Sequence, residues 1–141
     1  MIITLHSETE TPRTDNTLAE DGNFTFELPA NFTGNIYFDG VIASTGGIKW
    51  LFELPDGATS GGTMVAKKQN NPNPIHFAGR KVALTDGGNF THAWPVTILS
   101  LTGWITTGEN GGTCRFLWAQ NTTNATATVL DSGATMTIIG E

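Results

Sequence analysis

The sequence predicts an all-β protein: a single-domain antiparallel β-sandwich or jelly-roll of eight or nine strands with a short N-terminal arm. Helical spacing of apolar residues is missing from every window of about 11 residues that lacks Gly and Pro. Apolar and polar residues alternate instead, and Thr and aromatic residues are abundant. Turn signals built from Gly, Pro, Asn and Asp recur every 8–14 residues, and the longer connections favour a jelly-roll over an up-and-down barrel.

The first half of the chain contains the clearest strands. Residues 1–22 are expected to form the arm, a short strand followed by an acidic segment, and residues 23–141 the sandwich domain. Alternation predicts strands at 24–28, 35–44 and 48–54. Pro29 ends the first of these, and Pro55-Asp56-Gly57 is a strong turn signal after the third.

Further strands are predicted at 63–66, 81–85, 94–106 and 114–120, and in a last segment that carries Met136 and Ile138. In the 94–106 segment Leu99 and Leu101 change the phase set by Trp94, which predicts a β-bulge or a strand apolar on both sides near Leu99. The run NTTNATAT before the last segments is expected to be an exposed loop between two core strands.

Composition limits the possible functions. Charged residues make up 14% of the 141 residues and the net charge is −6, which argues against binding to nucleic acid or to a membrane surface. The single cysteine excludes an internal disulfide framework. No signal peptide and no run of about 20 apolar residues is visible, which predicts a protein made in a cytosol. The Asn-x-Thr triplets then reflect abundant Asn and Thr rather than glycosylation.

Catalytic patterns are weak. The histidines His6, His76 and His92 are scattered, and none has a second metal ligand at a suitable spacing, so no metal or cofactor is expected. A nucleophile pair of Cys114 with His76 or His92 stays open, but Cys114 shares the apolar face of its strand with aromatic residues, which favours a buried thiol. We therefore expect no enzymatic activity.

Tryptophans offer a second possibility, a sugar-stacking platform. Trp50, Trp94 and Trp118 fall on the apolar faces of their strands, which favours the core. Trp104 follows Gly103, and its role stays open at this point.

Three stretches carry a resemblance to a known class. The C-terminal FLWAQNTTNATATVLDSGATMTIIGE resembles the C-terminal signature of tailed-bacteriophage virion proteins. The stretches FELPANFTGNIYFDGVIAST and GGIKWLFELPDGAT resemble earlier segments of the same class. The resemblance covers roughly residues 24–60 and 90–140. It implies a jelly-roll trimer of the tumour-necrosis-factor or C1q kind, found as a head decoration protein or as a tail-fibre or baseplate tip.

The N-terminal arm and the absence of a coiled-coil stalk favour a decoration (cement) protein on the capsid exterior. Its partners would be its own copies, as a homotrimer, and the major capsid protein lattice. The alternative is a tail-fibre or baseplate tip that binds host glycans through Trp104, Tyr37 or the Asn/Thr-rich loops.

Charge and position suggest candidate contact residues with the capsid or a neighbouring subunit. In the arm these are Ile2 and Ile3, which are apolar, and Glu8 and Glu10, which are acidic. A basic region in the middle of the chain is the other candidate, with Lys67, Lys68 and Arg80.

Overall fold

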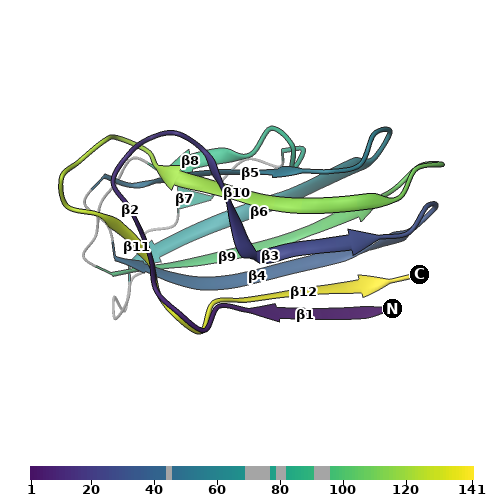
Figure 1. Ribbon diagram of the computed structural model, residues 1–141, viewed down its shortest axis with the longest axis horizontal. Helices are drawn as coiled ribbons and strands as arrows, with labels where there is room; N and C mark the ends of the chain where they lie inside the picture. The colour runs from purple at the N-terminus through teal and green to yellow at the C-terminus, as the bar shows by residue number, and fades with distance from the viewer. Residues whose placement is uncertain (44–45, 69–76, 79–81, 91–95) are drawn as a thin grey trace.

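A computed structural model confirms the antiparallel all-β sandwich (Figure 1). It describes residues 1–43, 46–68, 77–78, 82–90 and 96–141. In these residues there are twelve strands and no helix, against the eight or nine strands expected. The additional strands have two or three residues each, too few for an alternating pattern to show: β2 (Thr11–Arg13), β7 (Phe77–Ala78), β8 (Gly88–Phe90) and β11 (Thr128–Leu130).

The larger of the two sheets has eight strands. Its main path runs β1-β12-β4-β9-β6-β7, and β11 pairs with both β4 and β2 beside that path. The long strands of this sheet are β1 (Ile2–His6), β4 (Thr33–Ala43), β6 (Thr59–Lys68), β9 (Thr97–Thr106) and β12 (Thr135–Gly140).

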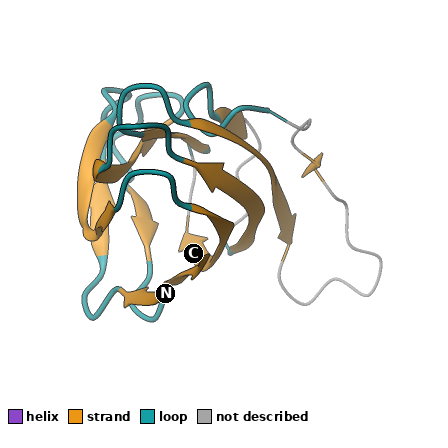
Figure 2. Cartoon of the chain, turned by 90° about the vertical axis from the view of Figure 1, so that its right-hand side faces the viewer, coloured by secondary structure: helices purple, strands orange, loops and turns teal. Residues whose placement is uncertain are grey.

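The smaller sheet has four strands in the order β3-β10-β5-β8, with β3 (Ala19–Leu28), β5 (Ile48–Glu53) and β10 (Gly112–Gln120) as its long members. Successive strands from β3 to β6, and again from β8 to β10, alternate between the two sheets. Each of these connections therefore crosses the sandwich, as in a jelly-roll. Figure 2 views the sandwich from the end at which both chain termini lie.

The core lies between the sheets and is built from the residues that alternate inward along each strand. Its centre is aromatic. The ring of Phe38 from β4 contacts Phe24 from β3 and Phe116 from β10, with ring centroids 5.4 and 5.3 Å apart. Phe52 from β5 lies 5.1 Å from Phe116. These rings join the two sheets, and edge-on and tilted aromatic pairs add to the free energy gained from burial.

The strand predicted at 81–85 is wrong for its described part. Val82 forms only an isolated bridge to Gly62, and a turn follows. The apolar alternation has another cause: the segment bridges the two sheets. Phe52 N donates a hydrogen bond to Leu84 O, and Leu84 N donates one to Ser60 Oγ, while the Leu84 side chain is fully buried. The chain resumes as strand β8 at Gly88.

Of the two alternatives predicted near Leu99, a β-bulge or a strand apolar on both sides, the bulge is wrong. Strand β9 keeps its register with both neighbours, and Leu99 and Leu101 both face the core. Trp94, which set the phase used in that prediction, lies outside the described residues. The register shift lies elsewhere, between Arg115 and Leu117 where β10 pairs with β3.

Residues 1–22 provide β1, β2 and the first residues of β3. Strand β1 pairs with β12 over its whole length and forms an edge of the larger sheet (Figure 1). The division of the chain at residue 22 stays a prediction.

The Asn/Thr/Ala-rich loop between β10 and β11 is exposed, but it folds around one buried amide. Gln120 is fully buried; its Nε2 donates to Thr126 O at 2.8 Å, and its Oε1 accepts from Asn124 N at 2.7 Å. Thr122 N also donates to Gly46 O at 2.8 Å. The loop thus has a fixed path that its composition does not reveal.

Candidate interaction surfaces

The outward-pointing residues of β1, β12, β4, β9 and β6 form one continuous surface, here called the large-sheet face. It consists of the even-numbered residues of β1 and β9 and the odd-numbered residues of β12, β4 and β6, because opposite residues in the register share a side of the sheet. One row of paired residues crosses all five strands: Ile2, Ile139, Asn35, Trp104 and Gly61.

Large apolar side chains are exposed along this row and beside it. Ile2 is 72% exposed, Ile139 45% and Trp104 40%. Tyr37 lies in the next row and is 39% exposed. Exposed apolar groups gathered on one face of a sheet mark an interaction site more often than scattered ones do.

Trp104 lies against the backbone of Gly61 on the neighbouring strand. A Cβ at position 61 would stand 2.8 Å from the indole Nε1 and 3.0 Å from Cε2, so any other residue would displace the ring. The absence of a side chain at Gly61 therefore lets the indole lie over strand β6.

An open depression of about 600 Å³ adjoins this indole. It lies at the start of β4 and at the ends of β9 and β12, beside the C-terminal residue Glu141. Its lining combines the apolar Trp104 and Ile139 with polar groups from Thr33, Asn35, Thr106 and Glu141.

The large-sheet face has few charges. Of its 22 positions eight are threonine, and only His6, Asp39 and Lys67 have acidic or basic side chains. Asp39 accepts a hydrogen bond from Ser100 Oγ at 2.9 Å on the same face.

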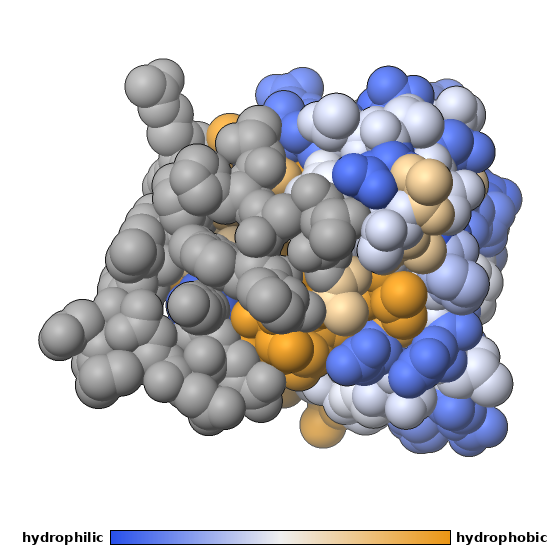
Figure 3. Space-filling model, turned by 90° about the vertical axis from the view of Figure 1, so that its left-hand side faces the viewer, coloured by the Kyte–Doolittle hydropathy of each residue, from blue (hydrophilic) through white to orange (hydrophobic). Residues whose placement is uncertain are grey.

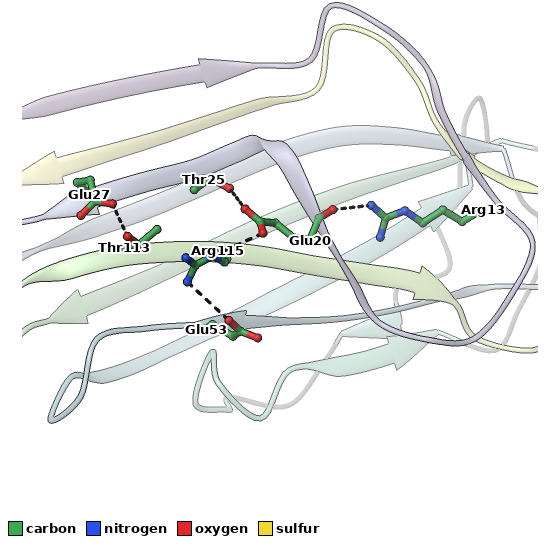
Figure 4. A network of polar contacts seen from close by, with 7 residues as sticks. All are labelled: Arg13, Glu20, Thr25, Glu27, Glu53, Thr113 and Arg115. Atoms are coloured by element: carbon green, nitrogen blue, oxygen red, sulfur yellow. Dashed lines mark hydrogen bonds and ion pairs between the residues drawn. The ribbon is translucent and has the colours of Figure 1, made fainter.

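The outer face of the smaller sheet is different, because a charged network crosses it (Figure 4). Arg115 on β10 lies 3.5 Å from the carboxylate of Glu20 on β3 and 3.9 Å from that of Glu53 on β5. Thr25 and Thr113 donate hydrogen bonds to Glu20 and Glu27 respectively. A face of this kind is well solvated, so the two outer surfaces of the sandwich are chemically distinct.

Arg13 ends strand β2 and reaches the end of the smaller sheet. Its guanidinium donates to the backbone carbonyls of Ala19, Glu20 and Trp118, the second of which is drawn in Figure 4. Burial lowers the pKa of Arg13 below its usual value, and Asp21 and Asp15 oppose this effect. The contacts attach the N-terminal segment to the sandwich.

The four candidate residues of the N-terminal arm separate in space. Ile2 lies on the large-sheet face, whereas Ile3 points to the other side of β1 and packs against the core. Glu8 and Glu10 lie exposed in the connection between β1 and β2, and Glu8 is 3.6 Å from His6. The structure thus places only Ile2 among the exposed apolar residues.

The basic candidates are placed in part. Lys67 is exposed on the large-sheet face, in the row of Val41 and Ile98. Lys68 is the last residue of β6, and Arg80 lies outside the described residues. The contact roles of all seven candidates stay predictions.

The cysteine, histidine and tryptophan residues considered for catalysis or sugar stacking lie in the core or outside the described residues, apart from His6 and Trp104. Cys114 is fully buried, and burial raises the pKa of its thiol to about 12, with the Glu27 carboxylate adding to the rise. His76 and His92 lie outside the described residues. Trp50 and Trp118 are buried, as their alternation predicts, and Trp94 is not among the described residues.

Two features are absent from the described part of the chain. No three His, Cys, Asp or Glu side chains there come together as a metal-binding group. Nor does that part contain a helix long and apolar enough to cross a membrane.

Figure 3 views the sandwich from the end opposite to the two chain termini, where a group of hydrophobic residues lies beside hydrophilic ones on the described surface.

Ile139 was not among the contact candidates named from the sequence, although it lies beside Ile2 and lines the depression. A signal was present: Ile138 and Ile139 are consecutive, so one of them must face outward from a strand. Gly61 carried no such signal, because its role depends on the pairing of β6 with β9.

Comparisons with known proteins do not assign this chain to a family. No family model matches the chain. No curated protein matches it either. Among solved structures, infectious bursal disease virus of the Gx strain aligns with 99% of this chain at 12% identity and a TM-score of 0.27. The VP2 subviral particle of the same virus aligns with 99% at 12% identity and a TM-score of 0.25. The chain spans about two fifths of the length of these proteins, and the scores are too low to assign a family.

Proposed function

We propose that this chain is a non-enzymatic structural protein of a bacteriophage virion, a decoration (cement) protein that binds the assembled head as a homotrimer and stabilises it. The observation that carries the proposal is the contrast between the outer surfaces of the sandwich. One is a large, charge-poor sheet face with exposed apolar residues, and the other carries a solvated charge network. The resemblance of residues 24–60 and 90–140 to phage virion proteins supports the same function.

The mechanism needs no reacting group. A protein that binds the assembled head and not its free subunits shifts the equilibrium toward assembly by mass action. Three weak head contacts in one trimer act together, because the first contact raises the effective concentration of the other two. On this proposal the protein is made in the host cytoplasm and ends on the capsid exterior.

The direct test is cosedimentation of the purified protein with expanded, empty heads of the phage that encodes it. We expect saturable binding and heads that resist heating better with the protein than without it. The paired charge reversals are Glu8→Lys with Glu10→Lys in the arm, and Lys67→Glu with Lys68→Glu in the basic region. The mass of each variant's assembly is measured as well, because Lys67 lies on the large-sheet face and its reversal could act on the assembly. The reversal that weakens head binding and its salt dependence while the assembly stays intact identifies the head contact. A protein that does not bind expanded heads is not a decoration protein.

A second function is favoured by one observation, the exposed indole of Trp104 beside an open depression lined by Thr33, Asn35 and Thr106. An aromatic ring beside amide and hydroxyl groups suits a sugar, as a tail-fibre or baseplate tip would require. Saturable binding to host cells, lost in Trp104→Ala, would support this function in place of the first. Release of sugar from host polysaccharide would contradict both.

A further inference from the structure

We infer that the large-sheet face is the surface through which this chain binds other copies of itself, with Trp104 as the anchor of the contact. The inference deepens the proposed function, since it rests on the self-association proposed there and assigns it to one face.

The extent of the face fits a stable protein contact. A standard interface uses about 20–30 residues of each partner, and the face offers 22 positions on five paired strands. Interface centres are poor in charged residues and rich in aromatic ones. The face is poor in charge, since only Asp39 and Lys67 among its positions are acidic or basic apart from His6, and it exposes two large aromatic side chains, Trp104 and Tyr37.

Trp104 is prepared for contact by its position on Gly61. The indole rests on the backbone of β6 on one side and is 40% exposed. A ring already held in one orientation loses little conformational entropy on binding, which is the property of an interface anchor. Tyr37 lies on the adjacent strand in the next row, at the diagonal distance at which large side chains still act together.

The distribution of charge favours a second copy of this chain as the partner that binds the large-sheet face. The chain carries a net charge of −6, so two copies repel each other through most of their surfaces. On the large-sheet face Asp39 and Lys67 balance, and the face is neutral when His6 is uncharged. Two copies can therefore approach through this face without like-charge repulsion.

A substitution on the face tests the inference. Thr102→Glu places a carboxylate between Tyr37 and Thr63, on an exposed position whose side chain does not enter the core. The matched control, Asn89→Glu, adds the same charge on an exposed position of β8 in the other sheet. Trp104→Ala removes the anchor. Circular dichroism and thermal unfolding check that each variant folds, and sedimentation equilibrium gives the mass of the assembly.

We expect the wild type and Asn89→Glu to form the same assembly. Thr102→Glu should weaken self-association about 100-fold or more, because a buried unpaired charge is costly, and Trp104→Ala about 30-fold. An assembly unchanged by both variants would overturn the inference, as would a wild type that is monomeric at high concentration or that binds a glycan through Trp104 as a monomer.

Failure of the inference and failure of the proposed function are distinguishable. If Thr102→Glu dissociates the assembly but the wild type does not bind heads, the face is a self-contact and the decoration function is wrong. If the wild type binds heads and Thr102→Glu stays fully assembled, the decoration function stands and the face is not the self-contact.

Discussion

The guanidinium of Arg13 lies over the indole ring of Trp118, with Cζ 4.3 Å from the ring centroid, although the two residues are 105 positions apart. The same indole donates from Nε1 to a carboxylate oxygen of the buried Asp21 at 3.0 Å. The N-terminal segment is thereby joined to the core of the smaller sheet by a cation–π contact and by the three carbonyl groups that Arg13 binds.

Arg13→Ala is expected to lower the free energy of unfolding by about 2–4 kcal/mol, because it removes charge-assisted hydrogen bonds to carbonyl groups and the contact with the ring. Arg115→Ala is the control: it removes an arginine whose ion pairs are half-exposed, and should cost less than about 1 kcal/mol. Urea unfolding of both variants measures the difference. Equal losses would show that Arg13 is no more than a surface charge.

Gln120 supports the Asn/Thr/Ala-rich loop, so Gln120→Ala should destabilise the protein by about 1–3 kcal/mol. The Asn124 amide loses its acceptor and should exchange its hydrogen much faster, which mass spectrometry or NMR detects. Thr122→Ala, at an exposed position of the same loop, should leave this exchange unchanged. Slow exchange at Asn124 in the Gln120 variant would mean that the loop is held by other contacts.

The buried thiol of Cys114 predicts a loss of stability in alkali. Its pKa rises from 9.0 to about 12 on folding. Below pH 9 both states hold a neutral thiol, and between pH 9 and 12 only the unfolded thiol ionises, so the native state loses up to about 1.4 kcal/mol per pH unit from this group. Urea unfolding at pH 8 and 10.5 should show this loss in the wild type but not in Cys114→Ala. Rapid native labelling of the thiol at pH 8 would contradict its burial.

Gly61→Ala tests whether the Trp104 indole depends on packing against the backbone of Gly61. The new Cβ would stand 2.8 Å from Nε1, so the indole must lift, but the ring is at the surface and the loss of stability should stay below about 1 kcal/mol. The indole N–H signal of Trp104 should shift in an NMR spectrum, and self-association should weaken. Gly22→Ala, where a Cβ meets nothing within 4 Å, is the control. An unmoved Trp104 signal would show that the ring does not depend on Gly61.

Much of the fold was predictable because alternation is a local property. Phe24 and Phe26 point inward and Lys49 and Arg115 point outward in the structure, as period-two spacing requires. The errors fall where this rule is ambiguous. Val82 and Leu84 alternate although they belong to no named strand, and the short strands offered too few positions to count.

The candidate surfaces were less predictable. Ile2 and Trp104 could be named as exposed or open candidates from their own strands, but nothing local indicated that they share a row with Ile139. The charge of Glu8 and Glu10 follows from residue type alone, whereas a contact role for them depends on a partner.

The sequence by itself determined the fold class, the side of each long strand that enters the core, and the low charge of the chain, because these follow from residue type and spacing. Only the tertiary structure decided which strands are neighbours. The pairing of β6 with β9 puts Trp104 over Gly61, and the approach of β2 to β10 puts Arg13 over Trp118. Such contacts join segments far apart along the chain, so their register is set by packing of the whole sandwich and not by any local pattern.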